Sequence, residues 1–223
     1  MAIATPESYA DMLDRAKAGK YAIPAINVTS SQTLSAALKG FADAESDGIV
    51  QISNGGAAYW SGSSRLDRVA GSLAFAGYAR AVGDLYPGIV GLHTDHCPKK
   101  FLDCWIHPLL EIEAERVKRG ELPVFQSHMW DGSAESLDDN IEIAVDMLKR
   151  SRAAHTVLEI EIGAVGGEED GIKGEENASL YTTADDAYRA IEALGLGENG
   201  RYITALTFGN VHGSYKPGHV KLR

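Results

Sequence analysis

The sequence predicts an α/β fold and, within that class, a (β/α)₈ TIM barrel of which this chain supplies about six βα units. Six short runs rich in β-branched and aromatic residues alternate with segments of helical periodicity. This order implies parallel strands with right-handed crossovers, in either an open doubly wound sheet or a barrel. The first strand–helix turn lacks G-x-G-x-x-G, and G-x-x-x-x-G-K-[ST] is absent, so the nucleotide-binding open sheets lose support. The barrel is therefore the expected architecture.

The expected elements follow in chain order. The six strands are the ranges 21–28, 48–53, 88–95, 123–129, 156–163 and 202–210. Two of the connecting helices have apolar faces, formed by Leu34, Ala37, Leu38 and Phe41 in the first and by Ile141, Ala144, Val145 and Leu148 in the second. A closed barrel needs eight strands, so we expect residues 1–223 to be a single, truncated barrel domain.

The composition is that of an ordinary soluble protein. With 44% hydrophobic residues, 223 residues can bury a sizeable core. The net charge of −10, without a basic patch, argues against nucleic-acid binding. Neither a signal peptide nor a membrane-spanning stretch is evident, so we expect a cytoplasmic protein without a membrane partner. Cys97 and Cys104 form no disulfide framework or zinc pattern and are expected to be free thiols.

The carboxyl ends of the expected strands are unusually polar, and in a barrel this is the rim where chemistry occurs. The residues at or just beyond these ends are Asn27, Ser53, Asp95, His96, His128 and Asp131. In the fifth strand, the period of two places Glu159 and Glu161 on one face. Two carboxylates facing a closed interior need cations, hydrogen bonds or a metal to offset their burial. Imidazoles at neighbouring strand ends favour the metal.

The histidines also have a structural interpretation. A single histidine at a strand end is more often hydrogen-bonded within the fold than catalytic. We adopt that interpretation for His93, His107, His155 and His219. His96 is a candidate ligand because Asp95, Glu161 and His212 share its expected rim. From these residues alone, a structural role for His96 is equally well supported.

The other candidates have structural alternatives too. Asn27 and Ser53 both precede helical segments and can be helix caps. The acidic segment GGEEDGIKGEEN fits a solvated turn and does not match the calcium-loop pattern. Lys216 fits a solvated loop lysine, and Cys97 fits a small buried residue.

Four motifs stand at successive expected strand ends: LHTDHCPKK, QSHMWDGSAESLDDNI, LEIEIGAVGGEEDG and TFGNVHGSYKPG. In this order they resemble the motifs of class II, metal-dependent fructose-bisphosphate aldolases, from about Tyr21 to the last residue. The resemblance implies a lyase of glycolysis and gluconeogenesis that reversibly cleaves fructose 1,6-bisphosphate to dihydroxyacetone phosphate and glyceraldehyde 3-phosphate. The His-Cys pair after Asp95 resembles the longer, usually dimeric subgroup, so a homodimer is implied.

The resemblance also implies a metal centre. It makes His96 and His212 ligands of a catalytic zinc ion. Asp131 and Glu161 would serve an alternative or second divalent position. A monovalent cation is a further cofactor that the family allows.

Acid–base and substrate-binding roles follow from the same resemblance. Asp95 would be the acid/base beside the zinc, and Glu169 would be a base carried on a mobile, glycine-rich loop. The substrate-binding positions would be Asn27, Ser53, Gly213 and Lys216.

The chain departs from the family at its end. Family members continue with a seventh strand ending in H-G-G-S/T, which supplies a third histidine ligand, and with an eighth strand ending in N-x-D-T. Neither segment is present before Arg223, so we expect the 223 residues alone to be inactive. Two alternatives to a fructose-bisphosphate aldolase stay open: a tagatose-bisphosphate or related ketose-bisphosphate aldolase, and a non-catalytic protein derived from one.

Overall fold

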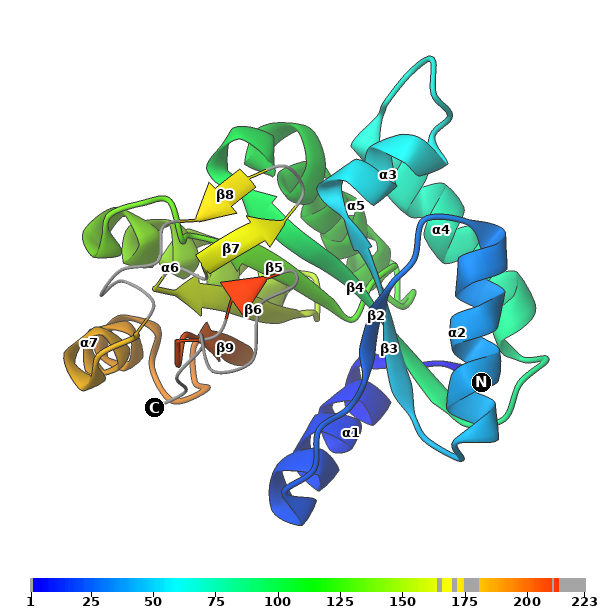
Figure 1. Ribbon diagram of the computed structural model, residues 1–223, viewed down its shortest axis with the longest axis horizontal. Coiled ribbons are helices and arrows are strands. Elements are labelled where there is room, and N and C mark those ends of the chain that lie inside the picture. Colours follow the sequence, from blue (N-terminus) through cyan, green and yellow to red (C-terminus); the bar gives the residue numbers. More distant parts are fainter. Residues whose placement is uncertain (1, 164–165, 170–171, 175–180, 210, 213–223) are drawn as a thin grey trace.

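A computed structural model describes the backbone of residues 2–163, 166–169, 172–174, 181–209 and 211–212, and the side chains of residues 2–163 and 181–209. Its main feature is a seven-stranded parallel sheet with helices around the outside (Figure 1). The strands are β1 (Ala2–Ile3), β2 (Ala25–Asn27), β3 (Gly48–Ser53), β4 (Ile89–Pro98), β5 (Ser127–Asp131), β6 (Val157–Ile162) and β9 (Tyr202–Leu206). The order is β2-β3-β4-β5-β6-β9, with β1 beside β4. The predicted parallel α/β fold is confirmed.

The helices connect consecutive parallel strands, as a barrel requires. They are α1 (Pro6–Gly19), α2 (Ser31–Asp43), α3 (Asn54–Trp60), α4 (Arg68–Gly83), α5 (His107–Lys118), α6 (Leu137–Ala153) and α7 (Ala184–Leu194). A 3₁₀ turn (Lys99–Phe101) and a π-helical turn (Leu102–Ile106) lead into α5. Among the described residues, no helix is both long and apolar enough to cross a bilayer.

Side-chain caps fix where several helices begin. Thr5, Ser30 and Thr183 form capping boxes at α1, α2 and α7, and Asp67 and Ser136 accept backbone N–H groups at α4 and α6. Each cap satisfies backbone N–H groups that have no partner within the helix, and contributes about 1 kcal/mol.

The predicted apolar faces are largely those observed. In α2, Leu34, Leu38 and Phe41 are buried. In α6 the prediction for Val145 was wrong, because that side chain is 43% exposed while Met147 is buried. The buried side chains of α6 do not form a row parallel to the helix axis. One turn takes 3.6 residues, so positions three or four apart are displaced slightly around the helix.

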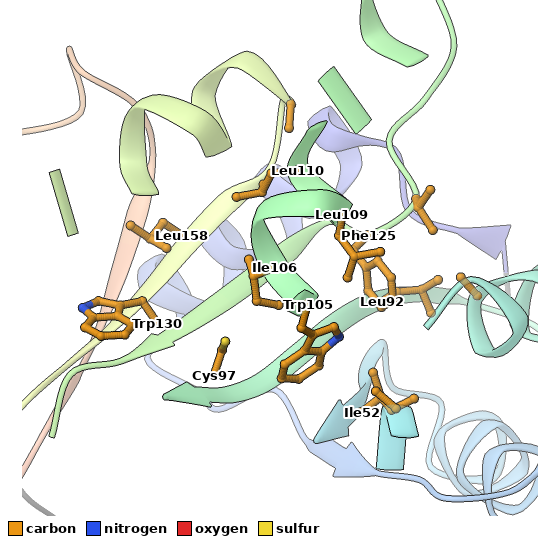
Figure 2. Close-up of a cluster of buried hydrophobic side chains, with 14 of the residues drawn as sticks. Ile52, Leu92, Cys97, Trp105, Ile106, Leu109, Leu110, Phe125, Trp130 and Leu158 are labelled. Carbon is orange, nitrogen blue, oxygen red and sulfur yellow. The ribbon is translucent and has the colours of Figure 1, made fainter. Parts of the chain in front are cut away.

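The main hydrophobic core lies between the sheet and the outer helices. Figure 2 shows part of it, with Trp105, Ile106 and Leu109 near Leu92 and Phe125. All five side chains are fully buried. Burying each contributes about 1.5–3 kcal/mol relative to exposure, so this layer holds the helices onto the sheet.

A smaller core lies under the barrel interior, where α1 covers the amino-terminal ends of the strands. Tyr9 and Met12 of α1 pack with Ile49 of β3 and Val157 of β6. At Gly91 of β4, a Cβ atom would lie 2.4 Å from the Tyr9 ring, so only glycine leaves room for this contact. The helix therefore acts as the floor of the barrel.

The described part of the sheet is curved but not closed. Strands β2 and β9 stand at its two ends, and within the described residues no pairing joins them. These are the first and sixth strands that the sequence predicts.

Several details differ from the sequence-based expectation. Strand β5 begins at Ser127 rather than at residue 123, and β4 continues to Pro98. The short strand β1 was not predicted, since two residues carry no periodic signal. A second small sheet, formed by β7 (Gly166–Glu169), β8 (Ile172–Gly174) and β10 (Val211–His212), was also missed. Glycine and charged residues have low strand propensity, and these strands depend on their partners.

Candidate metal and acid–base site

The site is built on a bulge in β4 at residues 94–97, called the β4 bulge below. Thr94 pairs with His128 of β5, but Cys97 pairs with Trp130, so β4 has one extra residue here. His96 adopts φ +45°, in the left-handed region that side chains rarely enter. In a regular strand, neighbouring side chains point to opposite faces. The β4 bulge instead places Asp95 and His96 at the same rim.

Three side chains from neighbouring strands form a candidate metal centre at this rim. His96 of β4, Asp131 of β5 and Glu161 of β6 have ligand atoms that all lie within 4.8 Å of one another. His96 Nδ1 is 3.4 Å from Asp131 Oδ2 and 3.5 Å from Glu161 Oε2. Nitrogen and carboxylate ligands in this number suit zinc and similar divalent ions. The donor set therefore fits a divalent metal ion, whereas the side chain of His212, the other predicted zinc ligand, lies outside the described residues.

The carboxylates control the protonation of His96. Burial lowers the pKa of the imidazole, but the hydrogen bond to Asp131 and the charges of Asp95 and Glu161 outweigh it and raise the pKa to about 10. Burial also raises the pKa of Asp131, yet hydrogen bonds from His96 and Ser133 hold it below its usual value. Without a metal, the imidazole carries a proton, which an incoming cation must displace.

Asp95 lies beside the three candidate metal ligands and is held in place by Asn27. The Asn27 amide donates a 2.7 Å hydrogen bond to Asp95 Oδ2, and Asp95 Oδ1 is 4.0 Å from His96 Nε2. Asp95 is only 7% exposed. Asn27 is not a helix cap, because Ser30 caps α2. A fixed, nearly buried carboxylate is suited to proton transfer with a bound molecule.

A second polar group lies deeper in the barrel. His93 Nδ1 and the Tyr9 hydroxyl each make a 2.8 Å hydrogen bond with Ser127 Oγ. His93 Nε2 is 3.4 Å from Glu159 Oε2. Burial and the charge of Asp95 raise the pKa of Glu159 to about 7, and burial lowers the pKa of His93 to about 4. The hydrogen-bonded role predicted for His93 is confirmed, and the period of two placed Glu159 on the interior face, but the sequence did not predict that these side chains meet Tyr9 and Ser127.

The strand faces agree with the sequence analysis of β6. Glu159 and Glu161 face the interior groups, while the core side of the same strand carries Leu158, Ile160 and Ile162. His128 belongs to the core side of β5. It is fully buried and bonds to Glu113 of α5, so it does not reach the rim.

The remaining predicted residues divide into three groups. Ser53 pairs in register with Asp95, and its hydroxyl accepts the Gly56 N–H as the cap of α3. Glu169 lies in β7 and His212 in β10, and these two strands pair with each other, with His212 opposite Gly167. The structure describes only the backbone of Glu169 and His212, not their side chains. Gly213 and Lys216 lie outside them entirely.

The chain is similar to known proteins over its whole length. A family model described as fructose-bisphosphate aldolase class-II matches residues 7–223. The fructose-bisphosphate aldolase of Streptomyces coelicolor is 63% identical over 223 residues, which are 100% of this chain and 65% of that protein. The protein of the same name from Corynebacterium glutamicum is 58% identical over the same shares of each chain.

A solved structure is similar as well. The crystal structure of the fructose-bisphosphate aldolase of Campylobacter jejuni matches with a TM-score of 0.82 and 36% sequence identity. The match covers 100% of this chain and 62% of that one. The chain thus spans about 65% of the length of the curated relatives that it matches.

Proposed function

Because the chain belongs to the class II fructose-bisphosphate aldolase family, we propose that it takes part in the reversible, metal-dependent cleavage of fructose 1,6-bisphosphate. The products are dihydroxyacetone phosphate and glyceraldehyde 3-phosphate. One observation carries the proposal: the β4 bulge brings a fixed carboxylate, Asp95, beside the cluster of His96, Asp131 and Glu161.

The resident metal that we propose is zinc. His96 would hold it together with His212, while Asp131 and Glu161 would serve a second divalent position. A bound divalent ion supplies a Lewis acid that stabilises the negative charge developing as the C3–C4 bond breaks. The two carboxylates and the imidazole of the described cluster support this assignment.

The acid–base steps fall to two carboxylates in this proposal. In cleavage, Asp95 accepts the proton of the C4 hydroxyl, and in condensation it returns that proton to the aldehyde oxygen. Asn27 holds the carboxylate in place through its 2.7 Å hydrogen bond. Glu169 exchanges the proton at C1 of dihydroxyacetone phosphate. Each positioned acid or base contributes roughly 10²–10⁴-fold to such a reaction.

Substrate binding is the proposed role of the other rim residues. Ser53 is next to Asp95 in the sheet register, which supports a position close to the reacting atoms. Gly213 and Lys216 remain assigned through the motif TFGNVHGSYKPG. We also infer a homodimer in the cytoplasm, from the His-Cys pair at Cys97 and the composition of the chain. Light scattering on the purified protein tests the dimer.

The experiment is a coupled assay of cleavage with metal removal, on a form of the chain extended to the length of its relatives, because the 223 residues alone are expected to be inactive. Chelation should abolish activity, and zinc or cobalt should restore it, because the donor set is nitrogen and oxygen. Rates on fructose 1,6-bisphosphate and on its C4 epimer, tagatose 1,6-bisphosphate, identify the preferred substrate. Activity that survives exhaustive chelation, or borohydride trapping of substrate on a lysine, would contradict the proposal.

A further inference from the structure

A buried carboxylate on α5 has no part in the function proposed so far. Glu113 is fully buried and lies one helical turn after Leu109, on the apolar face that packs against the sheet. An ionised carboxylate in such a layer is strongly unfavourable unless it is fully hydrogen-bonded. Glu113 therefore needs an explanation beyond packing.

Both oxygens of Glu113 are engaged by β5 and the segment before it. Oε1 accepts a 2.7 Å hydrogen bond from the Phe125 backbone N–H, and Oε2 is 2.8 Å from His128 Nε2. The Arg80 side chain binds the carbonyl groups of residues 123 and 124, next to Phe125, and its charge interacts favourably with Glu113. The carboxylate is thus the centre of a buried network, not an isolated charge.

The network continues through the imidazole to β4. His128 Nδ1 is 2.8 Å from Thr94 Oγ1, and both side chains are fully buried. A carboxylate can only accept, so Nε2 of His128 must carry a proton. In a neutral ring, Nδ1 is then an acceptor, and the Thr94 hydroxyl donates to it. With Glu113 ionised and the ring neutral, the direction of each bond in the network follows from Glu113.

Thr94 is the first residue of the β4 bulge. The Thr94–His128 pair is the last regular pairing before the register shift, and Asp95 and His96 follow at once. A shift of one residue along a strand moves each side chain to the opposite face. The hydrogen bond from Thr94 fixes its side chain on the core side, and Asp95 is thereby directed to the interior.

We propose that the buried Glu113–His128 pair is a positioning device, which acts through Thr94 to hold the β4 bulge in register. This inference rests on the proposed function, since the β4 bulge carries the candidate metal ligand and acid/base. Groups in the core layer would then control the geometry of the rim on the opposite face of the sheet.

The test compares loss of this network with loss of another buried hydrogen bond. Thr94→Val keeps the shape of the side chain and removes its hydroxyl, whereas Thr94→Ser keeps the hydroxyl and is the rescue. The matched control is Ser72→Ala. Ser72 Oγ accepts a 2.9 Å hydrogen bond from the Trp105 indole, both side chains are fully buried, and Ser72 lies on α4 rather than on β4 or β5.

Three readings are taken on the protein extended to the length of its relatives, because kcat cannot be measured on 223 residues that are expected to be inactive. In Thr94→Val, the amides of residues 95–97 should exchange with deuterium about tenfold faster or more. The Kd for Co²⁺, measured without substrate, should rise by up to about 10- to 100-fold, the range for groups that orient metal ligands, because Thr94 acts on His96 through the β4 bulge. The kcat for fructose 1,6-bisphosphate should fall more than KM rises, because the change affects alignment. Thr94→Ser should resemble the wild type, and Ser72→Ala should leave all three readings unchanged.

Glu113→Gln adds a spectroscopic reading. Glutamine can accept from the Phe125 N–H only by presenting its NH₂ group to His128 Nε2, which must then be an acceptor. The ring proton should move to Nδ1, and ¹⁵N chemical shifts of the His128 side chain report that change. This reading tests whether Glu113 sets the tautomer of the ring that bonds to Thr94, and amide exchange at residues 95–97 tests whether the effect reaches the β4 bulge.

The outcomes are distinct. Equal exchange at residues 95–97 and equal Co²⁺ affinity in Thr94→Val and Ser72→Ala would overturn the positioning role, as would an unchanged His128 tautomer in Glu113→Gln. A wild-type protein that cleaves no ketose bisphosphate even when extended to the length of its relatives would overturn the proposed function alone, because amide exchange and the tautomer still decide the role of the network.

Discussion

Replacing Glu159 with glutamine should abolish a loss of stability that the wild-type protein suffers as pH rises. Burial and the charge of Asp95 raise the pKa of this carboxyl from 4.5 to about 7. Between those values the folded protein holds a proton that the unfolded chain has released, so the free energy of unfolding falls with rising pH. At about 1.4 kcal/mol per unit of pKa, the loss is complete above pH 7 and amounts to about 3 kcal/mol.

The assay is urea unfolding at pH 4.5 and pH 8, with a chelator present. His93 has the opposite effect on the wild type, since its pKa is lowered to about 4 and stability gained from it rises between that pH and 6.5. The informative quantity is therefore the difference between wild type and Glu159→Gln, which should change by about 3 kcal/mol between the two pH values. Glu192→Gln, at an exposed position of α7, is the control. A difference that does not change with pH would refute the reasoning.

Three further predictions follow from the same structure. Asp95→Ala should mainly impair cleavage of the C3–C4 bond, and Glu169→Ala should mainly slow exchange of the C1 proton, each by roughly 10²-fold or more; equal, small effects in both assays would contradict the assignment. Because the pKa of His96 is about 10, Co²⁺ affinity should rise up to about tenfold per pH unit between pH 7 and 9. Proton release measured by calorimetry in two buffers checks this, and a pH-independent affinity would exclude His96 as a ligand. Gly91→Ala should lower stability by about 1–3 kcal/mol, seen as a lower Tm, since its Cβ would lie 2.4 Å from the Tyr9 ring.

Much of the sheet could be predicted because its strands have local signals. Each of the six main strands overlaps one of the apolar runs, although the ends differ, and the period of two was enough to place Glu159 and Glu161 on one face of β6. Periodicity and chain order also placed His96, Asp131 and Glu161 at strand ends that share one edge of the sheet, where the structure brings them together. Their assignment to a metal site came from the family resemblance.

The β4 bulge could not be predicted in this way. Its left-handed residue is His96, where a glycine would have given a signal, and the extra residue appears only against the register of β5. The link between Glu113 and His128 was hidden for a related reason. It joins residues 15 apart across two layers, and a glutamate on a helix usually indicates a solvated face. Packing between elements, rather than local preference, decides both features.

The floor of the barrel has a consequence for folding during synthesis. Tyr9 of α1 is synthesised early, whereas Ser127, to which the Tyr9 hydroxyl is hydrogen-bonded, follows 118 residues later. The pairing of β1 with β4 also waits, in this case for residues 89 and 90. At about 5–20 residues per second, translation leaves α1 without its Ser127 partner for about 6 to 24 s. Tyr9 and Met12, both fully buried in the finished protein, lack these partners in that interval. The amino-terminal helix is thus among the first parts to be synthesised, but its apolar face is completed only after more than half of the chain has been made.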